Sequence, residues 1–187
     1  MKIAIVISIS MLCLFATAQN IPAKSTTIAL ASNETQLVQE TLKGMLYRVQ
    51  DQVEQLASAF EEEQYDWKPA EGIRSVRESI LHVAAANYFL ATKLGYTPPA
   101  DTDFMTMEVN IKGKENVLAA LKESNEFILS KIIEEKAENF GSEVDFGFAK
   151  FNRLAGLLII LEHAGEHKGQ LIAYARSNNV TPPWSQQ

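Results

Sequence analysis

Residues 150–177, KFNRLAGLLIILEHAGEHKGQLIAYARS, decide the fold of this chain. The stretch contains no proline, and its apolar residues recur every three or four positions, which is the period of one face of an α-helix. Two asparagines and then two prolines follow it, and these are residue types that commonly end a helix. The sequence therefore predicts one long helix over this stretch.

Three upstream segments show the same helical period. They cover residues 33–60, 76–94 and 114–138. At the start of the second, Ser75 and Glu78 have the spacing of a capping box, in which each side chain satisfies a free backbone N–H. Four helices with one apolar stripe each must bury these stripes against one another. We therefore predict an all-α fold, a single four-helix bundle.

The segments between the helices are predicted to be loops. Residues 95–112 contain a Pro-Pro pair and several Asp and Thr residues, so we expect no helix there, and their length suggests a lid over a pocket. Residues 139–147 form a glycine-containing loop, and no alternating pattern of useful length indicates a strand. Trp67 and Trp184 are expected to pack at the end of the bundle.

The N-terminal residues 1–18 resemble an export signal, with a lysine, an apolar run of about 13 residues and an Ala-Thr-Ala cleavage site. A membrane anchor is disfavoured because roughly 20 apolar residues are needed to span a bilayer. We expect cleavage before Gln19, a flexible leader over residues 19–32, and the bundle domain over residues 33–187.

The composition limits the classes of function. The chain has 187 residues, of which 47% are hydrophobic and 21% are charged, and its formal net charge is −6. An acidic chain without a basic stripe is a poor ligand for nucleic acids or anionic membranes. Its single cysteine, Cys13, lies in the predicted signal, so no disulfide is expected. We expect a soluble periplasmic or extracellular product with no nucleic-acid or membrane partner.

Three histidines are the most informative residues. His163 and His167 are four positions apart in the last predicted helix, which brings their Cβ atoms within about 5–6 Å. His82 shares a face of the second helix with Ala86 and Phe89, which should point into the bundle. Buried imidazoles without partners would be costly, and one metal ion would satisfy all three. The alternative is that they are ordinary core histidines.

Several motifs resemble the DinB-like (YfiT-like) metalloprotein superfamily. They are HAGEHKGQ at 163–170, LIAYAR at 171–176, VTPP at 180–183, WKP at 67–69, and Ser75 with ILHVA at 80–84. The resemblance covers roughly residues 35–184. It implies a four-helix bundle, often dimeric, in which His82, His163 and His167 bind a divalent metal. It also implies a metal-dependent hydrolase or thiol transferase activity.

A site of three neutral imidazoles leaves at least one coordination position open, as in catalytic metal sites. Water at such a position becomes a nucleophile near neutral pH. Histidine ligands suit several divalent ions, of which we expect Zn or Ni. The leading expectation is therefore an exported metal-dependent hydrolase of a small substrate, with metal-bound water as the nucleophile.

Other polar residues are weaker candidates for the site. Glu166 is a candidate general base or a residue that supports a ligand, and the alternative is that it is a surface charge. Residues 163–167 also match an inverted zinc-protease motif, but we reject that family because too little chain follows to supply its third ligand. Gln170 and Asn152 lie on the histidine stripe and are candidates to orient a ligand or water. Arg74 and Arg77 flank the second helix and are expected to be ordinary exposed charges rather than anion-steering groups.

Two other functions remain open. One is a thiol transferase, against which export counts because low-molecular-weight thiols are chiefly cytosolic. The other is a non-catalytic metal-binding or interaction protein, in which the ion stabilises the bundle. A homodimer is compatible with each of these.

Overall fold

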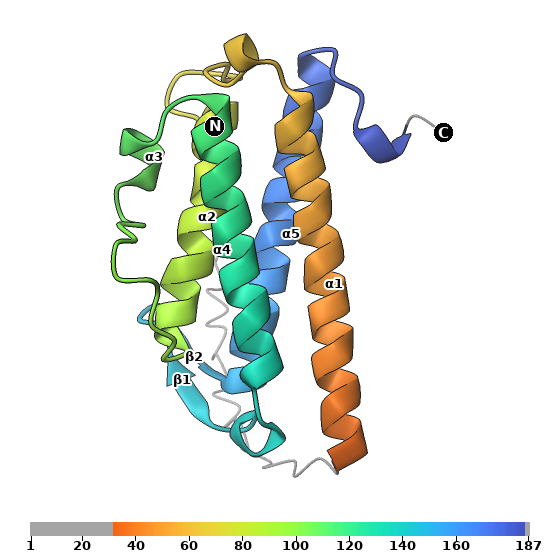
Figure 1. Ribbon diagram of the computed structural model, residues 1–187, viewed down its shortest axis with the longest axis vertical. Helices are drawn as coiled ribbons and strands as arrows, with labels where there is room; N and C mark the ends of the chain where they lie inside the picture. The colour runs from red at the N-terminus through yellow and green to blue at the C-terminus, as the bar shows by residue number, and fades with distance from the viewer. Residues whose placement is uncertain (1–31, 186–187) are drawn as a thin grey trace, which may run out of the picture.

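In the computed structural model, which describes residues 32–185, four long helices run side by side (Figure 1). They are α1 (Ser32–Ala59), α2 (Val76–Lys93), α4 (Lys114–Glu134) and α5 (Arg153–Ser177). Helix α1 packs on α4 and α5, and α2 packs on the same two helices, so α1 and α2 lie on one diagonal of the bundle. The prediction of a mainly helical fold is confirmed. The expected signal and most of the expected leader lie outside the described residues.

Shorter elements connect these helices. They are the 3₁₀ turns η1 (Glu62–Gln64), η2 (Ala137–Asn139) and η3 (Pro183–Ser185), the one-turn helix α3 (Met107–Asn110), and the strands β1 (Glu143–Asp145) and β2 (Lys150–Asn152). The two strands form an antiparallel hairpin in which Val144 lies opposite Phe151. None of the helices in residues 32–185 combines the length and apolar character needed to cross a bilayer.

The bundle interior contains two large apolar clusters stacked along its axis, and a smaller third cluster lies between α2 and segment 95–112. One cluster, near the end where η1 lies, includes Leu56, Phe60, Ile80, Leu121 and Leu171. The other, near the hairpin, includes Leu46, Ile128, Phe146, Leu157 and Ile160. Both draw residues from all four long helices, so burial of the four apolar stripes holds the bundle together.

Two predictions about the last long helix, α5, were wrong. The helix begins at Arg153 rather than Lys150, because residues 150–152 form β2. Asn152 is therefore not on the histidine stripe. It is the N-cap residue, and its side chain accepts a hydrogen bond of 2.8 Å from the backbone N–H of Ala155. The expectation that the chain contains no strand was also wrong.

Helix α4 ends at Glu134, four residues earlier than predicted. Glu135 has extended backbone angles and ends α4. Its side chain is buried and forms a forked ion pair with Arg153 at the start of α5, with distances of 2.6–2.9 Å. This ion pair joins the end of α4 to the beginning of α5.

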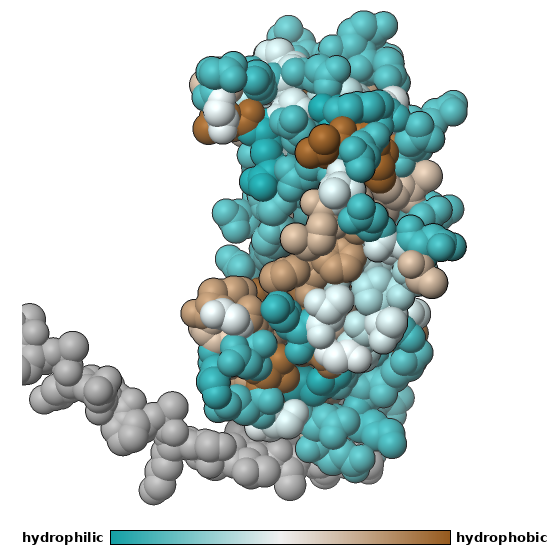
Figure 2. Space-filling view, turned by 90° about the vertical axis from the view of Figure 1, so that its left-hand side faces the viewer, coloured by the Kyte–Doolittle hydropathy of each residue, from teal (hydrophilic) through white to brown (hydrophobic). Residues whose placement is uncertain are grey.

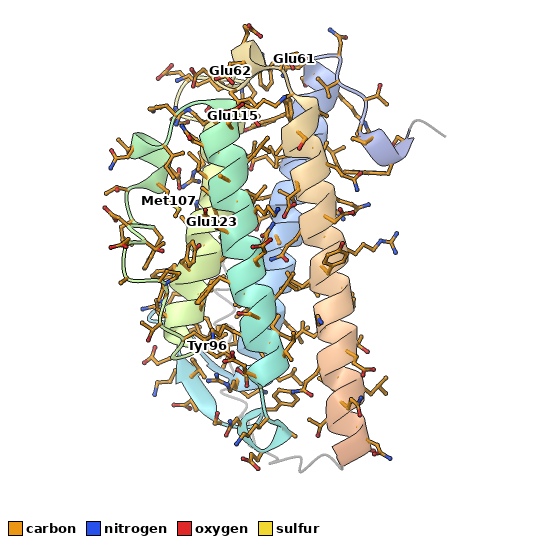
Figure 3. All side chains as sticks on the ribbon, in the orientation of Figure 1. Glu61, Glu62, Tyr96, Met107, Glu115 and Glu123 are labelled. Atoms are coloured by element: carbon orange, nitrogen blue, oxygen red, sulfur yellow. The ribbon has the colours of Figure 1, made fainter. Side chains whose placement is uncertain are left out.

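The segment 95–112, predicted to contain no helix, includes α3. Met107 points from α3 toward α2 (Figure 3), where it packs against Ala84 and Tyr88. Burial of Met107 explains why a single helical turn forms in a stretch rich in loop residues. At the end of the bundle where η1 lies, Trp67 packs edge-on against Tyr174, and Trp67 and Trp184 pack against the first apolar cluster, as expected.

Candidate metal centre

The three histidines meet between α2 and α5. His82 comes from the middle of α2, and His163 and His167 come from successive turns of α5. Each histidine places one ring nitrogen in a group in which all three nitrogens lie within 4.8 Å of one another. The ring centroids are 4.5–5.1 Å apart, and the Nε2 atoms of His82 and His163 are separated by 3.3 Å. The structure thus brings together the three residues that the sequence singled out.

The carboxylate of Glu108 orients the ring of His82. Its Oε1 atom lies 2.8 Å from Nδ1 of His82, and its Oε2 atom accepts a hydrogen bond of 2.7 Å from Nε of Arg74. Because the carboxylate is an acceptor, it favours the proton of His82 on Nδ1. The lone pair of Nε2 then faces the other two histidines, as required of a metal ligand.

His167 is oriented in the same way by an amide. Its Nδ1 atom lies 2.7 Å from Oε1 of Gln170, whose amide nitrogen donates to the hydroxyl of Tyr174 at 2.9 Å. The Tyr174 hydroxyl donates in turn to the backbone carbonyl of Arg74 at 3.1 Å. Gln170 therefore supports a candidate ligand, which is one of the two roles considered for it from the sequence.

Two arginines that were expected to be ordinary exposed charges hold this arrangement together. Arg74 binds Glu108 with its side chain and Tyr174 with its carbonyl, so it joins the supports of His82 and His167. Arg77 is buried and donates to Asp66 at 3.0 Å and to the backbone carbonyl of Glu108 at 2.8 Å. The expectation for Arg77 was wrong, because its guanidinium anchors α3 to α2.

The surroundings favour neutral imidazoles. Burial, together with the neighbouring His167, His82 and Arg74, lowers the pKa of His163 to about 4. Burial also lowers the pKa of His82, although the hydrogen bond to Glu108 opposes this shift. Burial alone would raise the pKa of Glu108, but hydrogen bonds from Arg74 and His82 outweigh it and lower that pKa. A carboxylate next to neutral imidazoles is a common support for metal-binding histidines.

Two other sequence candidates, Glu166 and Asn152, make no hydrogen bond to the three rings. Glu166 is exposed on α5, and Asn152 caps the start of that helix. Glu108 was missed by the sequence analysis. It lies in the segment expected to form a loop, and no spacing motif relates it to His82. The only signal for it was the length of that segment, which suggested that it covers a pocket.

Two cavities adjoin the centre, and Glu108 lines both. The first has a volume of about 630 Å³ and is bounded by His82, His163 and mostly apolar side chains, among them Phe89, Phe104, Phe151 and Ile159. The second also has a volume of about 630 Å³ and is lined mainly by polar groups, including Lys68, Arg74, Glu78 and Gln170. Segment 95–112 contributes Phe104, Met105 and Glu108 to the wall of the first cavity and Glu108 to that of the second.

These features define a four-helix-bundle protein with a convergent three-histidine centre. The chain belongs to the DinB superfamily, whose family model matches residues 45–171. An uncharacterized protein of Bacillus subtilis (strain 168), YjoA, is 29% identical to it over 140 residues, which cover 71% of this chain and 86% of that protein.

Solved structures show the same fold. A DinB-like protein from Bacillus cereus ATCC 10987 superposes with a TM-score of 0.63 at 14% identity, covering 72% of this chain and 89% of that one. The crystal structure of Bacillus subtilis YjoA superposes with a TM-score of 0.58 at 21% identity, covering 79% of this chain and 99% of that one. At these identities the likeness concerns the fold alone.

Proposed function

We propose that this protein binds one divalent metal ion through His82, His163 and His167 and is a metal-dependent hydrolase of a small substrate. The observation that carries the proposal is the convergence of three imidazoles, two of which are held at Nδ1 by hydrogen-bond acceptors. Ordinary core histidines have no need to direct their remaining nitrogens at one point. Membership in the DinB superfamily supports the same conclusion.

The donor set fits such an ion. Ligation requires neutral imidazoles, and the pKa values of His82 and His163 are lowered, which favours the neutral form. Three nitrogen donors suit Zn or Ni, and three protein ligands are the number usual in catalytic zinc sites. A bound ion would act as a Lewis acid on a substrate oxygen and would make water a better nucleophile.

The side chains around the histidines have separate tasks in this proposal. Glu108 and Gln170 hold the rings of His82 and His167 in one orientation, and Arg74 keeps both supports in place. The apolar cavity beside His82 and His163 binds the body of the substrate and excludes bulk water from it. Glu166, being exposed, is proposed only as a more distant proton acceptor.

The cellular setting is part of the proposal. The pattern of residues 1–18 supports export to the periplasm or beyond the cell, with the domain of residues 33–187 as the working unit. A homodimer is compatible with the family resemblance. The net charge of −6 supports a small-molecule substrate rather than a nucleic acid.

A thiol transferase is the second candidate function, and the polar cavity supports it. Arg74 and Lys68 line this cavity beside Gln170, so it offers a place for a polar co-substrate next to the histidines. Metal-dependent conjugation of a supplied thiol to an electrophile, without hydrolysis of ester or amide substrates, would favour this function.

A hydrolase screen on metal-loaded protein tests the proposal. We expect cleavage of a small ester or amide that is lost in His167→Ala and after chelation. If neither hydrolysis nor thiol transfer is detected, and chelation sharply lowers the melting temperature, the ion has the non-catalytic role of stabilising the bundle.

A further inference from the structure

We infer that the β1–β2 hairpin is the specificity element of the proposed site. Its residues Phe148 and Phe151 bind the apolar end of an elongated substrate, whose polar, hydrolysable end lies at the histidines. This assignment rests on the proposed function and deepens it by naming the length and the chemistry of the substrate. Three features of the molecule support it, namely the turn that presents Phe148, the direction in which the apolar cavity runs, and the composition of its wall.

The turn of the hairpin presents Phe148 at the cavity. The backbone N–H of Phe146 donates to the carbonyl of Ala149 at 2.9 Å, so Gly147 and Phe148 form a two-residue loop. Gly147 has a φ of +87°, which suits the first loop position of a type II′ turn and which glycine adopts without strain. Its N–H also donates to Oδ1 of Asp145 at 2.7 Å. This tight turn leaves the Phe148 side chain 67% exposed in the cavity lining.

Phe146 anchors the hairpin in the core. It is buried in the apolar cluster near the hairpin. The rings of Phe146, Phe148 and Phe151 form a group with centroids 5.7–6.2 Å apart, a separation at which aromatic rings attract one another. Because the inner ring is fixed in the core, the two rings that line the cavity have defined positions from which to bind a ligand.

The cavity runs along α2 from the histidines to the hairpin. His82 lines one end, and Phe89 and Leu90 line it further along the helix. Nζ of Lys93 lies 4.9 Å from the ring centroid of Phe89 and 4.0 Å from where a Cβ atom on Gly147 would lie, so the hairpin turn is at this second end. At a rise of 1.5 Å per residue, His82 and Leu90 are about 12 Å apart along the helix. A ligand that joins the two ends needs about this length.

The wall between the two ends is apolar. Helix α2 contributes Ala86, α5 contributes Ile159, and segment 95–112 contributes Phe104 and Met105. Met105 is 75% exposed, so it and Phe148 extend the apolar wall to the molecular surface from two different connections. Viewed from the side of α3, the surface shows apolar patches within a hydrophilic surround (Figure 2). Burial of an apolar body in this cavity of about 630 Å³ would supply most of the binding free energy.

Charged groups of both signs lie at the cavity. Glu162 lines it, Lys93 lies beside the hairpin, and the proposed metal ion would lie at the histidine end. Selection therefore depends on apolar contact and length rather than on net charge. The substrate class that fits is an ester or amide joined to an aryl or alkyl body about 12 Å long. A shorter substrate would leave the hairpin without contact.

Two uncharged probes of different length test this role of the hairpin. Benzyl alcohol fills only part of the cavity, whereas 4-phenylbenzyl alcohol carries a second ring in line with the first. NMR titration of the protein as purified, repeated after chelation, should give binding of the longer probe that is about tenfold tighter or more, because a further ring is buried. The ratio of the two affinities should be the same with and without metal, since an alcohol is a weak metal ligand.

Variants place the second ring at the hairpin. Phe148→Ala should lower the ratio of the two affinities about threefold or more, while the affinity for benzyl alcohol stays unchanged. Tyr47→Ala removes an aromatic side chain of similar exposure, 61%, from α1 outside the cavity, and it should change neither affinity. Ala86→Phe places a ring between the two ends of the cavity and should weaken binding of both probes. Circular dichroism checks that each variant is folded.

Four results would each overturn the inference. They are equal affinity of the wild-type protein for the two probes, an unchanged affinity ratio in Phe148→Ala, an equal fall of that ratio in Tyr47→Ala, and unchanged affinities in Ala86→Phe. Metal analysis of the same samples tests the proposed centre separately. A full complement of metal with a ratio that does not depend on Phe148 refutes only the role of the hairpin. Dependence on Phe148 in a protein that binds no metal refutes only the proposed centre.

Discussion

Oε1 of Glu108 on α3 lies 2.8 Å from Nδ1 of His82 on α2, and within the described residues Glu108 is the only carboxylate that is hydrogen-bonded to one of the three histidines. This hydrogen bond fixes which ring nitrogen of His82 faces His163. Since Glu108 is also held by Arg74 and, through its backbone, by Arg77, the position of α3 and the orientation of the histidine depend on each other.

Removal of the Glu108 carboxylate should therefore weaken metal binding. Supporting groups of this kind typically change metal affinity by about 10–100-fold. We expect Glu108→Ala to weaken zinc binding within this range, and Glu108→Gln, which keeps an acceptor oxygen, to have a smaller effect. The affinities can be measured by competition with a zinc-binding dye. The control is Glu115→Gln, at an exposed position of α4. Unchanged zinc affinity in Glu108→Ala would contradict the role of Glu108 in supporting His82.

The lowered pKa of His163 predicts a pH dependence of stability in the metal-free protein. With a pKa of about 4 in the folded state and 6.5 in the unfolded state, the unfolded chain binds more protons between these values. The free energy of unfolding should then fall as the pH drops from 6.5 toward 4, and His82 should add to the fall. Above pH 6.5, His163 should no longer make the free energy of unfolding depend on pH.

Urea unfolding at several pH values tests this dependence. His163→Asn lacks the titrating ring, so its stability should fall less steeply over the same range than that of the wild-type protein. Parallel curves for the two proteins would show that protonation of His163 does not oppose folding.

The ion pair between Arg153 and Glu135 predicts a large effect on stability. The Glu135 side chain is only 2% exposed, so Arg153→Met would leave a buried carboxylate without its partner. We expect a loss of about 3–5 kcal/mol in the free energy of unfolding. Lys150→Met breaks the exposed pair with Glu143 and should leave the free energy of unfolding almost unchanged, because water screens an exposed ion pair. Equal losses in chemical denaturation would refute the distinction.

Two glycines in helices should respond in opposite directions to alanine. A Cβ atom at Gly156 would lie 2.8 Å from Cζ of Phe146, a fully buried ring, whereas one at Gly44 would meet nothing within 4 Å. Gly156→Ala should therefore destabilise the protein by about 1–3 kcal/mol. Gly44→Ala should stabilise α1 by about 0.5–1 kcal/mol. Thermal unfolding of both variants measures the difference, and stabilisation by Gly156→Ala would contradict the close packing of α5 on the hairpin.

The long helices were predictable because each keeps its apolar period over several turns. The hairpin was not, since strands of three residues are too short to show alternation. The first residues of the last predicted helix, including Asn152, lie in that hairpin or cap the helix, and they fit a helical pattern equally well in the sequence. Helix ends depended on tertiary contacts such as the one that buries Glu135.

The site was predictable to the extent that it follows helical geometry. His163, His167 and Gln170 share a face of one helix, so their proximity follows from their spacing. Glu108 and Arg74 reach the centre from connections whose paths depend on where Met107 and Arg77 are buried. No periodic pattern encodes such paths. Glu108 therefore emerged only from the structure, and Arg74, which the sequence analysis took for an ordinary exposed charge, was linked to the centre only there.

The metal content of untagged protein spanning residues 19–187 tests the central claim most directly. Elemental mass spectrometry should find about one divalent ion per chain in the wild-type protein and in Glu126→Ala, and almost none in His163→Ala. Circular dichroism should confirm that all three remain helical. An absence of stoichiometric metal from the wild-type protein, even after incubation with Zn or Ni, would contradict the account and leave the three histidines as core residues of a helical bundle.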